Sequence, residues 1–120
     1  MTTIFVLLIA FQIKHFLADY PLQGKYMLGK FRDHNWEVPL AAHAGLHATF
    51  TFVIAMFFGF EIALGVALLD FGIHFIVDRL KVVFSRGVTT QEPKFWWLLG
   101  LDQLAHHLTH YTIIAILVFL

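Results

Sequence analysis

The sequence contains no cysteine and few charged residues. Without cysteine, the chain can form no disulfide framework, no thiolate zinc site and no cysteine nucleophile. Charged residues make up 13% of the chain, against about 25% in a typical soluble domain. Hydrophobic residues make up 59%, which leaves too little polar surface for a soluble fold. The composition therefore indicates a protein of the lipid bilayer, and the net charge of zero gives no reason to expect nucleic-acid binding.

Four apolar segments are each close to the roughly 20 residues that one membrane crossing requires: about residues 3–20, 38–58, 60–84 and 98–120. They predict an all-α fold, an integral membrane four-helix bundle that forms a single transmembrane domain over residues 1–120. The first segment lacks the basic region and cleavage site of a signal peptide, so we expect it to remain as a spanning helix. The start of the last helix is open, because Pro93 suits a first helical turn whereas Gly100 offers a break.

Four crossings place both termini on one side of the membrane and the two polar connections on the other. All eight lysines and arginines lie in these connections or toward the same end of the adjoining segments: Lys14, Lys25, Lys30, Arg32, Arg79, Lys81, Arg86 and Lys94. The positive-inside rule then makes the side of the connections cytoplasmic. We expect a location in the inner (cytoplasmic) membrane, with both termini on the non-cytoplasmic side.

Histidines and aspartates recur at steps of four residues in every segment, which places them on one face of each helix. The set comprises His15, Asp19, His43, His47, Asp70, His74, Asp78, Asp102, His106 and His110. Because successive segments run in opposite directions, all ten groups fall in the half of the membrane next to the polar connections. The other half is almost purely apolar, and Asp70 and His110 are expected to lie deepest.

Ionisable groups inside a membrane are costly and mark functional sites by default. Helical bundles hold metals on helical carboxylate and imidazole pairs of the Glu-x-x-His type, and such ligands suit zinc, iron, manganese or nickel. We predict one or two divalent ions, zinc preferred, in the cytoplasmic half of the bundle. The predicted metal ligands are His15, Asp19, His43, His47, Asp70, His74, Asp78, His106 and His110.

Five residues are assigned other roles in the predicted site. Asp78 and Asp102 are the predicted catalytic residues, Asp102 as a ligand, a partner of a ligand or a general base. Arg79, Gln12 and Gln103 are predicted to bind substrate, with Arg79 against an anionic head group. The alternatives are interhelical packing for the glutamines, haem between paired histidines and a purely structural hydrogen-bond network. Interleaved aspartates and the lack of a c-type attachment motif disfavour haem.

The chain resembles a family of domains of unknown function from small bacterial and phage four-helix membrane proteins. The resemblance covers nearly the whole chain and rests on QIKHFLADYPLQ, HAGLH, DFGIHFIVDRLK and DQLAHHLTHY. It implies little about activity, because that family is largely uncharacterised. A weaker similarity, in size and in helical His/Asp pairs, points to bacterial membrane-bound metal-dependent hydrolases, a likeness that does not itself establish a reaction.

The predicted function is a membrane-embedded metal-dependent hydrolase that acts on an amphiphilic or phosphate-bearing substrate at the cytoplasmic leaflet. A bound divalent ion can lower the pKa of water to about 7 and so supply hydroxide. The alternatives are a divalent-metal transporter or sensor, and a membrane interaction module with a structural metal. The apolar half argues against a channel within one chain, because a permeation path needs polar lining, but a homo-oligomer could form such a path between subunits.

Overall fold

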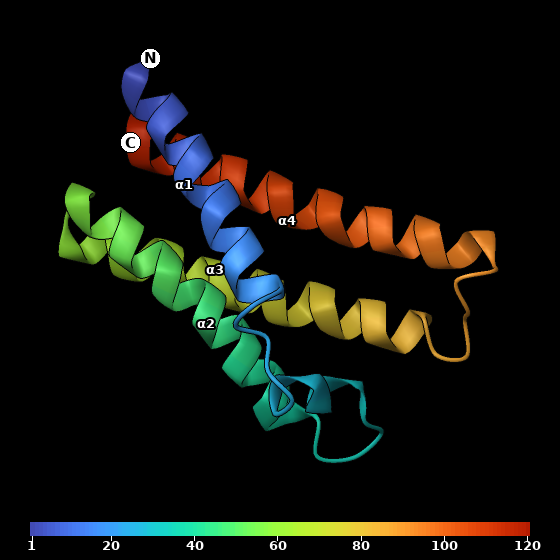
Figure 1. Ribbon diagram of the computed structural model, residues 1–120. Helices are drawn as coiled ribbons and strands as arrows, with labels where there is room; N and C mark the ends of the chain where they lie inside the picture. Colours follow the sequence, from blue (N-terminus) through green and yellow to red (C-terminus); the bar gives the residue numbers. More distant parts are fainter.

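The computed structural model describes residues 1–120, and its regular secondary structure is entirely helical. Four long helices are α1 (Thr2–Asp19), α2 (Glu37–Ala55), α3 (Phe60–Phe84) and α4 (Pro93–Phe119), and two short 3-10 helices are η1 (Met27–Phe31) and η2 (Met56–Phe58). Both termini and the α2–α3 turn lie at one end of the bundle, the termini end, and the two longer connections lie at the other, the loop end (Figure 1). The predicted all-α fold of four helices is confirmed.

The tightest connection joins α2 to α3, which are the most extensively packed pair of helices. Here η2 is followed by Gly59, whose φ of 121° and ψ of 154° are open to glycine but strained for any residue with a side chain. The chain reverses direction at this residue, so α2 and α3 form an antiparallel hairpin.

An apolar core fills the termini end of the bundle. Its buried side chains come from all four long helices: Leu7, Phe11, Ala55, Ala63, Val66, Ile113, Ile114 and Leu117. The buried histidines and aspartates lie beyond this core, toward the loop end. The interior is thus divided into an apolar half and a polar half.

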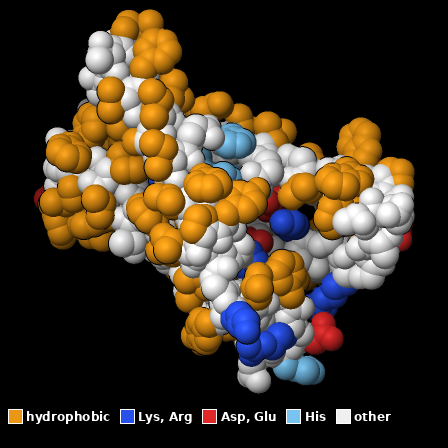
Figure 2. Space-filling view, viewed as in Figure 1, with side chains coloured by type: hydrophobic (Ala, Val, Ile, Leu, Met, Phe, Trp, Pro, Cys, Tyr) orange, Lys and Arg blue, Asp and Glu red, His pale blue; other side chains and the backbone are white.

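Large hydrophobic side chains also cover much of the outer surface (Figure 2). Three helices are long and apolar enough to cross a membrane: α1, α2 with η2, and α3. α4 is longer still, but its histidines, Asp102 and Gln103 lower its mean hydropathy. Three of the four expected crossings are therefore supported by length and composition.

α4 begins at Pro93, earlier than the expected start at Leu98, and continues through Gly100 without a break. Proline at the first helical position has no amide hydrogen to leave unpaired, and Glu92 before it is extended. The Trp96 indole donates to the Thr90 carbonyl oxygen at 2.9 Å, which anchors the first turn to the preceding loop. A glycine inside a helix costs only about 1 kcal/mol, so one such residue does not interrupt a helix of this length.

The helices differ in length in a way that opens the bundle at its loop end. At 1.5 Å per residue, α1 spans about 27 Å, whereas α3 and α4 span about 37 Å and about 40 Å. α3 and α4 continue past the end of α1 (Figure 1). The space between them is therefore left uncovered beyond Asp19, the last residue of α1.

We expect Gly59→Ala to lower the free energy of unfolding by roughly 1–3 kcal/mol, because alanine would be held in a strained backbone conformation. The measurement is thermal unfolding in detergent, followed by circular dichroism. Gly65→Ala is the matched control, since Gly65 is helical and nothing lies within 4 Å of an added Cβ. A similar loss of stability in both variants would contradict the role given to the Gly59 turn.

Candidate metal centre

Four side chains from three helices converge at the end of α1: Asp19 of α1, His43 and His47 of α2, and His74 of α3. One potential ligand atom from each lies within 4.8 Å of all the others. The two α2 histidines are one helical turn apart, so both rings face the same neighbours. All three histidines are buried, and the Asp19 side chain is 16% exposed. The group is thus a nearly enclosed set of three imidazoles and one carboxylate.

The Asp19 carboxylate is the centre of this group. The His47 Nε2–H donates to Asp19 Oδ1 at 2.8 Å, and the Nε2 of His43 lies 3.3 Å from the same oxygen. The Nε2 of His15 lies 3.1 Å from Asp19 Oδ2. One carboxylate at the end of α1 therefore contacts imidazoles of both α1 and α2.

Asp19 differs from the other aspartates of the polar half in its partners. The carboxylates of Asp70, Asp78 and Asp102 each lie within 4 Å of a lysine, whereas the charged groups near the Asp19 carboxylate are histidines only. A carboxylate in the interior needs a compensating positive charge. A protonated imidazole or a cation bound among the imidazoles would supply it.

Two further observations fit a metal ion at these four residues. The His43 Nε2 lies 3.3 Å from Asp19 Oδ1, which is the ligand–ligand edge of a site with ~2.0–2.1 Å metal–ligand bonds, and all four ligand atoms lie within 4.8 Å of one another. The His74 ring makes no hydrogen bond to the protein although it is buried. It lies between His47 and His106, with ring centroids 3.9 Å and 4.1 Å away. Its nitrogens are thus free to bind an ion.

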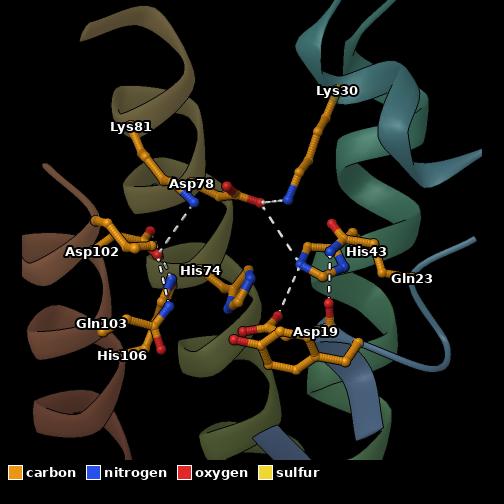
Figure 3. Close-up of a pocket in the computed structure, with 12 residues that line it drawn as sticks. Asp19, Gln23, Lys30, His43, His74, Asp78, Lys81, Asp102, Gln103 and His106 are labelled. Carbon is orange, nitrogen blue, oxygen red and sulfur yellow. Dashed lines mark hydrogen bonds and ion pairs between the residues drawn. The ribbon is translucent and has the colours of Figure 1, made fainter. Parts of the chain in front are cut away.

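A pocket of about 220 Å³ opens beside the four-residue group (Figure 3). Its lining is mostly polar. All four long helices and the connection between α1 and α2 contribute to it: Asp19, Tyr20, Gln23, Lys30, His43, His74, Asp78, Lys81, Leu99, Asp102, Gln103 and His106. Asp19, His43 and His74 thus face the pocket, whereas His47 lies behind them. The pocket occupies the space that the short α1 leaves between α3 and α4.

The α4 wall of the pocket carries a hydrogen-bonded carboxylate–imidazole pair. The His106 Nε2–H donates to Asp102 Oδ1 at 3.1 Å, and the Gln103 amide donates to Asp102 Oδ2 at 3.0 Å. Gln103 Oε1 in turn accepts from the His15 Nε2–H at 2.9 Å. This chain of contacts fixes the His106 ring next to His74. Such a pair can accept and return a proton.

Two lysines border the pocket. Lys30 lies on η1 and donates to Asp78 Oδ2 at 2.7 Å, and both side chains are about 95% buried. Lys81 lies on α3, with its ammonium 3.8 Å from Asp102 Oδ2. Figure 3 shows the ammonium groups of the two lysines on either side of the Asp78 carboxylate. Asp78, predicted as both ligand and catalytic residue, is therefore engaged by Lys30, and its Oδ2 lies 3.7 Å from His43 Nε2.

A separate polar group lies deeper in the bundle. The Lys14 ammonium donates to Asp70 Oδ2 at 2.8 Å and to His110 Nε2 at 3.2 Å, and the Thr51 hydroxyl also donates to Asp70. Asp70 and His110 are thus the deepest members of the polar half, and they belong to this group rather than to the four-residue cluster. Lys14 is 2% exposed. Lys14 is therefore an interior residue and does not contribute to the positive-inside pattern, which depends on the seven other lysines and arginines.

Two predicted substrate-binding residues lie away from the pocket. The Arg79 guanidinium stacks on the Trp36 ring at 3.6 Å, and its Nη1 has no hydrogen-bond partner. Gln12 contacts His107 at 3.4 Å on the exposed side of α1. Of the three predicted substrate-binding residues, only Gln103 lines the pocket.

Sequence reasoning did not identify the lysines of the interior. The burial of Lys14 could have been predicted, because a lysine well inside an apolar segment needs an acidic partner. The burial of Lys30 could not, since its position depends on how η1 folds back over the bundle. Lys81 fits the positive-inside pattern of the sequence, and the structure places it one helical turn beyond Val77 on the side of α3 that faces α4.

Two comparisons with known proteins yield no match: no curated protein and no solved structure is similar to the chain. A family model described as "Protein of unknown function (DUF3307)" matches residues 7–120. The match agrees with the expected resemblance to a family of domains of unknown function. The weaker similarity to metal-dependent hydrolases receives no support from any comparison.

We expect the purified protein to contain a divalent ion that is lost in His47→Ala and His74→Ala, because each variant removes one of four ligands. The measurement is metal content by mass spectrometry, with circular dichroism to show that each variant is folded. His34→Ala is the control, since His34 lies in the α1–α2 connection outside the cluster. Folded His47→Ala and His74→Ala proteins that retain the ion would contradict the assignment.

Asp70→Leu should destabilise the protein by roughly 3–5 kcal/mol, because it leaves the buried Lys14 without its carboxylate. Adding Lys14→Met should recover most of this loss, since the pair is then replaced by apolar side chains of similar size. Chemical unfolding of the single and double variants measures the difference. The double variant should also retain its metal, and loss of metal from it would place Asp70 among the ligands.

Proposed function

Because the chain belongs to the DUF3307 family, whose description assigns no activity, we propose its function from the site itself: a membrane-embedded metal-dependent hydrolase with an amphiphilic or phosphate-bearing substrate. The observation that carries the proposal is the opening of the Asp19/His43/His47/His74 cluster onto a pocket that also contains the Asp102–His106 pair. A catalytic metal site needs a coordination position for water besides its protein ligands, and in this cluster that position would be a fifth one on the side of the pocket. An open metal cluster beside a proton-accepting pair suits hydrolysis.

The membrane setting of the proposal is an integral protein of the inner membrane with the loop end in the cytoplasm. All four helices cross the bilayer in this arrangement. The polar side chains that lower the mean hydropathy of α4, such as Asp102, His106 and His110, are buried in the bundle. They need not contact lipid, so they do not prevent α4 from spanning. The pocket would then lie in the cytoplasmic leaflet, within reach of lipid head groups.

Hydrolysis would need metal ligands and a general base, and the cluster and the α4 wall of the pocket provide both. Asp19, His43, His47 and His74 would hold one divalent ion, zinc preferred, whose chemistry is Lewis acidity and a lowered pKa of water. His106 accepts the proton of the attacking water and later returns it to the leaving group. Asp102 fixes the orientation of the His106 ring and stabilises its protonated form. The Gln103 amide holds Asp102 in place through its own hydrogen bond.

The bound ion, together with Lys30 and Lys81, would give the pocket a preference for an anionic substrate. Three aspartates and two lysines are the charged residues of the lining, so one divalent ion changes the formal charge of the pocket from −1 to +1. Asp78 keeps Lys30 extended into the pocket. A phosphate ester or another anionic ester would thus be attracted once the ion is bound.

A transport function has less support. The apolar core at the termini end consists of tightly buried side chains from all four helices, and an ion path would need polar groups there. A membrane interaction module with a purely structural metal would leave the open pocket and its two lysines without a role.

We expect the protein, purified and reconstituted in vesicles, to hydrolyse a generic ester such as p-nitrophenyl phosphate or p-nitrophenyl acetate, and a chelator to abolish turnover. His106→Ala should lower kcat by about 10²–10⁴-fold, the usual contribution of a general base, while metal content is unchanged. His107→Ala, at the adjacent position of α4, is the control and should keep its activity. Turnover that persists in the chelated protein, or in metal-loaded His106→Ala, would refute the mechanism.

A further inference from the structure

A second, apolar groove lies next to the polar pocket, on the outer surface of the bundle, which would face lipid in the proposed membrane setting. It runs between α3 and α4 at the loop end and has a volume of about 280 Å³. Its apolar lining is one face of each helix at helical spacing: Val77, Leu80 and Phe84 of α3, and Leu98, Leu101 and Ala105 of α4. Leu80, Phe84 and Leu101 are about half exposed, so the groove is accessible from outside.

The groove and the polar pocket share two residues, Lys81 and Asp102. The Lys81 ammonium lies 3.8 Å from Asp102 Oδ2, and this pair stands between the two spaces. In Figure 3, Lys81 and Asp102 mark the side of the pocket formed by α3 and α4. The two spaces are thus separated by this one ion pair, and a molecule whose polar end occupies the pocket would reach the groove by displacing the partly exposed Lys81 side chain.

From this adjacency, and resting on the proposed function, we propose that the substrate is an anionic amphiphile whose phosphate lies in the pocket beside Lys81 and whose hydrocarbon chain lies in the α3–α4 groove. The pocket alone is smaller than the roughly 300–1,000 Å³ of most small-molecule sites. Pocket and groove together fall within that range. One part is polar and cationic when an ion is bound, and the other is apolar, which matches the two ends of such a molecule.

A comparison within the protein shows what sets this groove apart. Another apolar groove lies at the termini end, lined by Ile4, Leu8, Tyr111, Ile114, Ala115 and Phe119. It contains no charged residue and borders no polar pocket. Ordinary lipid chains would fill both grooves, but only the α3–α4 groove offers a phosphate a place to bind at its inner edge.

The test uses a non-hydrolysable alkyl phosphonate with a photoreactive diazirine in a twelve-carbon chain, added to the full-length protein in phosphatidylcholine vesicles. Mass spectrometry maps the labelled residues. We expect labelling of the α3–α4 groove, with at least a tenfold preference over a neutral alcohol of the same chain length. Equal labelling by the two probes would show bulk lipid contact only and would overturn the proposal.

Two variants on α4 separate the groove from the apolar surface in general. Ala105→Phe should reduce phosphonate labelling about tenfold, the loss expected when roughly two methylene groups are kept out of the groove. Ala115→Phe, the same change in the groove at the termini end, should leave it unaltered. Lys81→Gln should reduce labelling by the phosphonate but not by the alcohol. If Ala105→Phe has no effect while Lys81→Gln does, the phosphate binds without the chain and the amphiphile assignment fails.

Competition identifies the source of the phosphate. Unlabelled dodecyl phosphonate should prevent labelling at concentrations at which inorganic phosphate does not, and equal competition by inorganic phosphate would contradict an amphiphilic ligand. Because the probe is not hydrolysed, the result is independent of catalysis. Labelling without esterase activity would refute the proposed hydrolysis but not the amphiphilic ligand. If the protein is not labelled and hydrolyses esters at a rate that does not depend on chain length, the amphiphilic ligand is refuted but the hydrolysis is not.

Discussion

The neutralisation of buried carboxylates is the constraint on which the polar half of this bundle depends. Four aspartates project into an interior where an uncompensated charge costs several kcal/mol. Lysines from other segments neutralise three of them: Asp70 by Lys14, Asp78 by Lys30, and Asp102 in part by Lys81. Asp19 is left with imidazoles only. The carboxylate without a lysine is the one that belongs to the potential metal cluster, so the distribution of cations selects the position of the site.

The architecture, and the gathering of histidines and aspartates into one half of the bundle, could be predicted because they follow from periodicity. Steps of four residues fix a face of each helix, and alternating direction fixes the depth, as His43, His47 and His74 show. The partners within that half could not be predicted, because they depend on helix rotation and on loops. Asp70 and Asp78 have the same spacing as the cluster residues, yet lysines engage them. Lys30 reaches Asp78 only through η1, and Arg79 stacks on Trp36, contacts that no regular spacing encodes.

The lengths of the helices connect the fold to the proposed chemistry. α1 ends at Asp19 while α3 and α4 continue, so the residue that closes the cluster also stands at the edge of the open space. Had α1 extended one or two turns further, its side chains would fill the pocket and cover Lys81 and Asp102. The shortness of α1 thus accounts for the access of water to the proposed metal site.

The pair formed by Lys14 and Asp70 also bears on how the chain assembles during synthesis. Its two members are separated by 56 positions along the chain, and α1 emerges from the ribosome long before α3. In the proposed membrane setting, the nascent α1 would carry an unmatched ammonium at a depth where charge is costly. α1 would take its final position only after α3 has been synthesised and Asp70 can pair with Lys14. The first helix would accordingly wait near the translocation machinery or at the lipid–water boundary, and integration of the bundle would be completed late, as a concerted step.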